Sequence, residues 1–308
     1  MELGLYTDSL PDHTLDEALD VAMRVGATAI EIATGGQSSA PHLRMEDLLG
    51  DAGRRAAFQS AFADRGLRLA ALNCSAWPLH PVAGDAHVAV IRKTIRLASE
   101  LGVTKLVTMS GSPGDGPSGT AVNFVWYPWP DESRTLLERQ WDEGIALWRD
   151  LGAEAEAAGI DAIAFELHPL HLVYNVPTFE RMREAVGPII GVNVDPSHLF
   201  WQAMDPLAVV RALGSAVKHV HAKDTETVAS QAAIAGVLDQ RPFDHPAKRA
   251  WVFRTAGAVH DRAWWAAFVD ALREVGYDDA LAIENEDPYL PAEAAVEEAA
   301  RFLGPIIA

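Results

Sequence analysis

The chain has 308 residues, of which 49% are hydrophobic and 22% are charged, the composition of an ordinary soluble globular protein. Its formal net charge of −18 would repel the phosphate backbone, so DNA and RNA are poor candidate partners. A single cysteine, Cys74, excludes an intrachain disulfide framework and a cysteine-rich metal site. Because Cys74 lies in an apolar run, we expect a buried and inert thiol.

The N-terminal segment carries an acid at position 2 and soon turns polar, unlike a signal peptide. No run approaches the roughly 18 apolar residues that a membrane helix needs. We therefore expect a cytoplasmic protein without a membrane partner.

Short apolar or β-branched runs alternate along the chain with stretches of helical period, which indicates repeated βα units and a parallel sheet. Helices are expected between the strands, as at 15–26, 87–102 and 264–276, each ending at a glycine that suits a helix C-terminus. Together the units predict a single domain over residues 1–308, a (β/α)8 TIM barrel with its active site at the carboxyl ends of the strands. The eight predicted strands lie at residues 3–8, 29–33, 67–75, 105–111, 163–169, 190–196, 217–224 and 280–287.

Two connections are long, at residues 112–133 after the fourth strand and at about 225–260 after the seventh. Structureless loops beyond about 15 residues are usually functional or disordered. We expect both segments to act as lids or substrate walls on the active-site face.

Four predicted strand ends carry metal-ligand side chains: Glu166 in FELHP, Asp195 in VNVDPSHLF, His221 in KHVHAKD and Glu284 in LAIENEDP. One such charge alone is more often solvated or paired, but four on strands five to eight favour a metal site. Three carboxylates and one imidazole suit Mn²⁺, Mg²⁺ or Co²⁺ better than a thiolate-selecting metal. Mn²⁺ is our first choice, with Mg²⁺, Co²⁺ and Zn²⁺ as alternatives.

Three further histidines lie close to these residues in the sequence. His168 points to the same side as Glu166 and further out, so it suits an acid, a base, a sugar contact or a structural role. His198, three residues after Asp195, suits a substrate contact or a structural task at a helix N-terminus. His219 is expected to be a satisfied interior histidine.

Lys223 and Asp224 extend the seventh strand, where an ammonium could hold a substrate hydroxyl or oxyanion, or form a surface ion pair. Trp77 and the segment NFVWYPWP (123–130) offer aromatic faces that could stack on a sugar or a flat aglycone. The same aromatics could instead pack on one another or at an oligomer interface, and exposed apolar surface around the lids favours a homo-oligomer.

The motifs DPSH, HVHAKD and IENEDP, with VYN (173–175), FWQ (200–202) and FRTAG (253–257), resemble the sugar phosphate isomerase/epimerase family of xylose isomerase-like TIM barrels. The resemblance covers nearly the whole chain. It implies the four metal ligands above, His198 as a substrate-side partner, and Arg254 and His260 as site residues from the seventh loop. Asn285 departs from the IEHED of relatives without removing the neighbouring ligand.

The third strand, with NCS followed by PLHP, and the tryptophan-rich segment also resemble the catalytic (alpha) subunits of C-glycoside deglycosidases. Trp77, for its aromatic face, and His80 are predicted as substrate-binding residues. A small second subunit would then be a partner.

We expect a metal-held enediolate with Glu166 or Glu284 as acid and base, an intermediate that permits isomerisation, epimerisation or elimination. Few Lys or Arg residues stand near the mouth, which favours an uncharged keto-sugar or 3-oxo-glycoside over a sugar phosphate. Three alternatives stay open: an isomerase or epimerase, a lyase that eliminates an aromatic aglycone, and a non-catalytic sugar-binding barrel.

Overall fold

The structure, a computed structural model, describes residues 1–116 and 118–308. Eight strands form a closed barrel in the order β1-β10-β7-β6-β5-β4-β3-β2. Each overlaps one of the eight predicted strands, so the predicted (β/α)8 barrel is confirmed. The barrel strands are β1 (Glu2–Tyr6), β2 (Ala29–Gly36), β3 (Arg68–Ser75), β4 (Lys105–Thr108), β5 (Ala162–Glu166), β6 (Ile190–Val194), β7 (Val217–Ala222) and β10 (Ala280–Ile283).

Helices connect the strands, and the three helices predicted by residue range are found. They are α1 (Leu15–Val25), α2 (Met45–Gly50), α3 (Ala52–Ala63), α4 (Gly84–Leu101), α5 (Asp131–Ala157), α6 (Val176–Val186), α7 (Pro196–Phe200), α8 (Pro206–Leu213), α9 (Ala229–Ala235), α10 (Arg262–Glu274) and α11 (Ala292–Ile307), with short 3-10 turns at Thr7–Ser9, Gly214–Ala216 and Pro246–Lys248. None of the helices among the described residues has the length and apolarity needed to cross a membrane.

The chain divides into two compact units. The terminal unit comprises residues 1–31, 62–68 and 194–308, and the central unit comprises residues 32–61 and 69–193. The interpretation of residues 1–308 as one domain stays a prediction.

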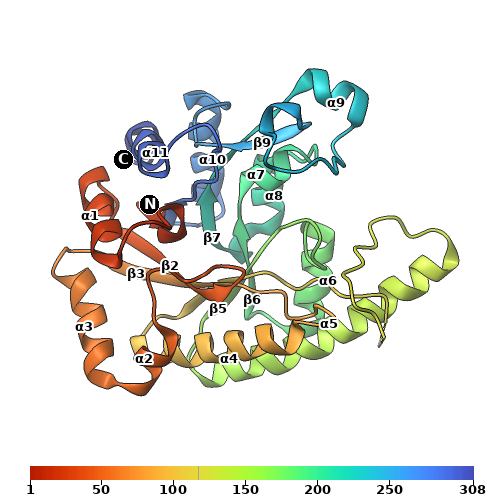
Figure 1. Cartoon of the computed structure of the whole chain (residues 1–308), viewed down its shortest axis with the longest axis horizontal. Helices are drawn as coiled ribbons and strands as arrows, with labels where there is room; N and C mark the ends of the chain where they lie inside the picture. Colours follow the sequence, from red (N-terminus) through yellow and green to blue (C-terminus); the bar gives the residue numbers. More distant parts are fainter. Residues whose placement is uncertain (117) are drawn as a thin grey trace. The chain divides into compact units, whose positions relative to one another are not determined.

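In the terminal unit, β1 pairs in parallel with β10 and with the start of β2, and β10 pairs with β7. A side chain at Gly4 would place its Cβ 3.1 Å from Ala282 Cα and 3.2 Å from Ala280 Cβ, so the absence of a side chain here lets β1 lie close against β10. Helix α11 packs on β1, α1 and α10 (Figure 1).

Local sequence signals fix the helix ends. Thr14 and Glu17 form a reciprocal capping box at the start of α1, and Gly26 ends that helix with φ of 80°. Asn175 and Thr178 form the corresponding box at α6. These caps satisfy backbone groups that a helix terminus would otherwise leave unpaired.

The segment after β7 is folded rather than structureless. Strands β8 (Asp224–Thr227) and β9 (Trp251–Arg254) pair antiparallel, and Trp251 stacks on Trp201 with ring centroids 4.6 Å apart. The barrel strand therefore ends at Ala222, and Asp224 opens a separate hairpin instead of extending β7.

In the central unit, β3, β4, β5 and β6 pair successively in parallel. Ala71, Val107 and Ala164, one from each of three neighbouring strands, form a buried cluster of small side chains. Trp148 of α5 is fully buried, packs edge-on against Phe165 and donates from Nε1 to the carbonyl of Ser110 at 2.8 Å. Cys74 is buried, as expected, and burial raises the pKa of its thiol to about 12.

The predicted long connection after β4 is present, and it is described except for residue 117. A β-bridge joins Gly114 to Val122, and the Asn123 N–H donates to the Pro113 carbonyl at 2.8 Å. The yellow segment before α5 at the right of Figure 1 follows this course.

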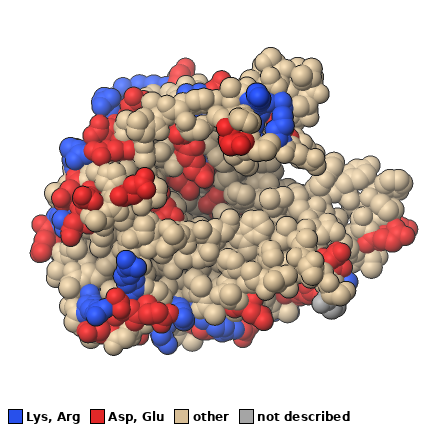
Figure 2. Space-filling view, viewed as in Figure 1, with Lys and Arg blue, Asp and Glu red and all other residues tan. Residues whose placement is uncertain are grey.

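Acidic and basic side chains are interspersed on the face shown in Figure 2. This distribution, with 43 Asp and Glu against 25 Lys and Arg, does not favour a polyanionic partner.

Gly36 provides a test of the central unit's packing. Its φ is +87°, and an added Cβ would lie 2.4 Å from the Ser75 carbonyl oxygen. We predict that Gly36→Ala lowers the free energy of unfolding by about 2 kcal/mol or more, because backbone strain and a backbone clash add.

Urea denaturation measures this change. Gly50→Ala is the matched control, because nothing lies within 4 Å of the added Cβ and Gly50 has no positive φ. Equal stability of the two variants would contradict the packing described.

Candidate active site

Three of the predicted ligands lie together in the terminal unit. Asp195 caps α7 by accepting the Ser197 N–H at 2.8 Å, His221 lies on β7, and Glu284 follows β10 directly. Asp195 and His221 are buried, and the Glu284 side chain is 15% exposed. The amino end of α7 and the carboxyl ends of β7 and β10 therefore present two carboxylates and an imidazole.

His221 is held at both ring nitrogens. Its Nδ1 lies 2.9 Å from Oε2 of Glu284, and its Nε2 lies 2.9 Å from Oε2 of Glu31. Tyr6 stacks on the ring, with centroids 5.6 Å apart and planes 9° apart. The imidazole thus has a fixed plane, with Nδ1 directed at a predicted metal ligand.

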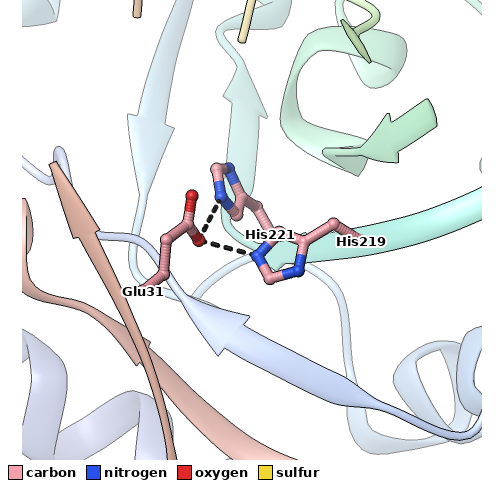
Figure 3. Close-up of side chains that lie close together, drawn as sticks. All are labelled: Glu31, His219 and His221. Atoms are coloured by element: carbon pink, nitrogen blue, oxygen red, sulfur yellow. Dashed lines mark hydrogen bonds and ion pairs between the residues drawn. The ribbon is translucent and has the colours of Figure 1, made fainter. Parts of the chain in front are cut away.

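Glu31 was not predicted as a site residue. It is buried on β2, and the same oxygen that faces His221 also lies 2.7 Å from Nε2 of His219 (Figure 3). His219 is a buried, hydrogen-bonded histidine, as expected. A lone acid inside the apolar run AIEIA was the sequence signal that could have identified Glu31.

Burial would raise the pKa values of Glu31 and Glu284 and lower that of His221, but the ion pairs outweigh it. The two histidines hold the pKa of Glu31 below its ordinary value, and Lys223 and His221 hold that of Glu284 well below its own. Glu31 and Glu284 in turn raise the pKa of His221 well above its ordinary value. The three groups form a buried line of alternating charge.

Lys223 is an interior cation, not a surface one. Its Nζ lies 3.1 Å from Asp195 Oδ2, 2.8 Å from Glu284 Oε2 and 2.7 Å from Glu286 Oε2, and it lies over the Phe253 ring at 4.7 Å. Carboxylates from two different strand ends thus converge on one cation.

His198 lies beside this group. Its Nε2 is 3.4 Å from Asp195 Oδ2, and its ring packs edge-on against Phe253. Burial lowers the pKa of His198 to about 4, so the imidazole is neutral at pH 7.

Asp224 and His260, predicted as substrate-binding residues, contact each other. Asp224 Oδ1 lies 2.5 Å from His260 Nδ1, and Asp224 Oδ2 accepts the His260 N–H at 2.9 Å. Phe200 stacks on the imidazole with centroids 3.8 Å apart. Arg254 pairs with Glu226 and with Asp287, at 3.1 Å for the latter.

The central unit holds the other predicted residues. Glu166, buried at the end of β5, accepts a hydrogen bond from Asn193 Nδ2 at 3.4 Å. His168 follows two residues later, and its Nδ1 lies 2.5 Å from the Pro169 carbonyl oxygen. The role of Glu166 as the fourth metal ligand stays a prediction.

Trp77 and His80 lie close to each other, with ring centroids 6.3 Å apart. His80 Nδ1 accepts the N–H groups of Val82 and Ala83, both at 3.1 Å, and so caps the turn before α4. Trp77 also packs edge-on against His171 at 5.0 Å. Substrate binding by Trp77 and His80 stays a prediction.

The predicted ligands of the terminal unit offer donor types that a divalent cation takes. Among the described residues of this unit, the possible ligand atoms of Glu31, His219 and His221 lie within 4.8 Å of one another. Asp195 and Glu284 supply oxygen, and His221 would bind through Nδ1, because its Nε2 is engaged with Glu31. A carboxylate on the distal nitrogen of a metal-binding histidine fixes the tautomer and orients the ring. Two carboxylates and one imidazole do not select one metal.

Residues 19–306 match the family described as xylose isomerase-like TIM barrel. The chain belongs to this family. The predicted resemblance to sugar phosphate isomerases and epimerases of this fold is thereby confirmed at the level of the family.

A curated relative, the uncharacterized protein YfiH of Bacillus subtilis (strain 168), is 38% identical over 307 residues, 98% of each chain. The probable 3-DHS dehydratase AsbF of Bacillus anthracis has a TM-score of 0.70 at 14% identity, over 99% of both chains. D-psicose 3-epimerase of Clostridium cellulolyticum H10, solved with D-tagatose, has a TM-score of 0.65 at 12% identity, over 100% of this chain and 99% of that chain. The IOLI protein, solved with a binding zinc atom, has a TM-score of 0.66 at 19% identity, over 100% of this chain and 98% of that chain. These three structures share the fold.

A substitution of Glu31 tests whether this carboxylate supports His221 as a metal ligand. We predict that Glu31→Gln weakens Mn²⁺ binding by roughly 10- to 100-fold, because the imidazole loses the carboxylate that orients it. Isothermal titration calorimetry measures the affinity, and circular dichroism checks that the variant is folded.

The matched control is Glu226→Gln, which removes a carboxylate that contacts Arg254 and not His221. Unchanged Mn²⁺ affinity in the folded Glu31→Gln variant would show that Glu31 does not support a metal ligand.

Proposed function

We propose that the protein is a divalent-metal-dependent isomerase or epimerase that acts on an uncharged keto-sugar or a 3-oxo-glycoside. The observation that carries the proposal is His221, fixed between Glu31 and Glu284 so that Nδ1 faces the second carboxylate. Membership of a family that includes sugar isomerases and epimerases supports it.

Asp195, His221 and Glu284 would hold the metal, and Glu166 is proposed as the fourth ligand. When bound, the metal would act as a Lewis acid that acidifies the proton on the carbon next to a substrate carbonyl. Mn²⁺ is our first choice, and Mg²⁺, Co²⁺ and Zn²⁺ are alternatives.

Proton transfer is assigned to the glutamates. Glu284 and Glu166 are proposed as the acid and base that remove and return a proton at the substrate carbon. Return of the proton to the opposite face of the same carbon epimerises the sugar, and return to the neighbouring carbon isomerises it.

Neighbouring side chains would position the substrate. Lys223, with its ammonium among carboxylates, is proposed to contact a substrate oxygen, and His198 and His168 are proposed to contact hydroxyls. Asp224 and His260, held as a pair, and Arg254 are proposed as further substrate contacts.

The charge of the site supports an uncharged substrate. Lys223 and Arg254 are each paired with at least two carboxylates, so neither adds net positive charge. A phosphate group would instead call for a cluster of cations or a glycine-rich helix N-terminus.

A second candidate function is a lyase that releases an aromatic aglycone from a 3-oxo-C-glycoside. The aromatic segment of the central unit favours it, because Trp126, Tyr127 and Trp129 expose 57%, 56% and 71% of their surface. In this reaction C2 loses a proton, a C1=C2 double bond forms, and the aglycone leaves C1 with the bonding electrons and takes up a proton. A homo-oligomer, a small second subunit and a cytoplasmic location remain predictions.

Deuterium incorporation tests the proposal. We predict that the Mn²⁺-loaded protein in D₂O adds one deuterium next to the carbonyl of D-fructose or phenyl 3-oxo-glucoside, read by mass spectrometry. EDTA should abolish the exchange, and Glu284→Gln should slow it by at least about 100-fold.

Glu286→Gln is the matched control, because Glu286 also contacts Lys223 but is 51% exposed and is not a predicted ligand. Release of phenol together with a sugar product that contains the C1=C2 double bond would establish elimination, on an O-linked aglycone, and favour the lyase. An unchanged rate in Glu284→Gln would contradict the assigned site.

A further inference from the structure

The central unit contains a cavity of about 150 Å³ between the segment after β4, helix α5 and the start of α6. Its walls are mainly apolar and aromatic. The side chains that form them include Phe124, Trp126, Leu137, Trp141, Leu172 and Tyr174. Phe124 and Trp126 belong to the aromatic segment 123–130 considered above, and the other four side chains were not assigned to the site.

One buried side-chain amide, that of Gln140, holds the walls of the cavity in place. Gln140 of α5 is 1% exposed, and its Nε2 donates to the carbonyls of Gly114 at 2.8 Å and Asn123 at 2.9 Å. These carbonyls lie on the two arms of the segment that the Gly114–Val122 bridge joins. Gln140 therefore holds both arms on α5 and fixes the walls.

Most of the polar groups at the cavity walls already form hydrogen bonds within the chain. Both donor positions of the Gln140 amide are used, and Thr178 Oγ1 accepts two backbone N–H groups and donates to Asn175. Phe124 and Tyr174 pack edge to face at 5.2 Å. A polar sugar ring would find few partners here, whereas an apolar ring would bury its faces.

The cavity adjoins the end of β5. His171, which lines it, packs edge-on against His168 at 5.4 Å, and His168 follows Glu166 by two residues. The Gly111 N–H donates to His171 Nδ1 at 3.2 Å. This contact helps to fix the His171 ring at the wall of the cavity.

We propose that this cavity binds a single aromatic ring carried by the sugar substrate. This inference rests on the proposed function only in attaching the ring to a sugar that reacts at Glu166. The volume suits one ring, since a dry apolar cavity of about 150 Å³ in another protein binds benzene. The substrate class is therefore an aryl glycoside.

Phenol is the probe, titrated into the full chain in EDTA and followed by saturation-transfer NMR. We expect saturable binding to the wild type. Leu137→Trp, which fills the cavity, should weaken it by at least about tenfold, a loss of 1.4 kcal/mol. Leu136→Trp, the matched control on the same helix, should bind within about twofold of the wild type, because Leu136 does not line the cavity.

A second pair of variants tests the cavity if Leu137→Trp does not fold. Trp126→Ala removes a wall and should weaken phenol binding, whereas Trp129→Ala removes a more exposed tryptophan outside the lining and should not. Equal affinities within both pairs, or no saturable binding to the wild type, would overturn the proposal.

The titration needs neither metal nor turnover, so its result is separate from that of deuterium exchange. Phenol binding without exchange would leave the aromatic subsite standing and remove the proposed activity. Exchange without phenol binding would leave the proposed activity standing and remove the aromatic subsite.

Discussion

The candidate site depends on one imidazole that two carboxylates hold from opposite sides. His221 is fully buried, so a charge on it would cost several kcal/mol without partners. Glu31 and Glu284 supply those partners, and His219 and Lys223 complete the alternation of charge. Removing one member would leave the others with uncompensated buried charge, which explains why a whole set of ionisable groups lies at these strand ends.

The two units contribute different chemistry to the proposal. The terminal unit supplies charge, with carboxylates gathered around His221 and Lys223. The central unit supplies an apolar cavity whose walls are held by Gln140 and which lies beside the end of β5. The charged cluster of the terminal unit suits polar oxygens of a ligand, whereas the cavity of the central unit suits an apolar ring.

Much of the barrel could be predicted, because apolar runs of strand length mark the barrel strands. Asp195 and Glu284 immediately follow two of these strands, so their place at strand ends could be predicted too, while their role as metal ligands stays a prediction. Glu31 was missed: the lone acid in the apolar run AIEIA marks it as unusual, but its contacts are with histidines 188 and 190 residues away, which local sequence does not reveal. The prediction that Asp224 extends the seventh strand was wrong. Asp224 instead pairs with Arg254 in a separate sheet, and local sequence does not reveal such a non-local pairing. The cavity depends on Gln140. In the sequence this residue looks like any polar, solvent-exposed position of a helix, so its buried role could not be predicted.

The most direct measurement of the central claim is anomalous diffraction at the manganese edge from crystals grown with MnCl₂. We predict a peak bounded by Nδ1 of His221 and the carboxylates of Asp195 and Glu284, with Glu31 still bonded to Nε2. A peak on the Nε2 side, between Glu31 and His219, or no peak in crystals that bind Mn²⁺ elsewhere, would contradict it.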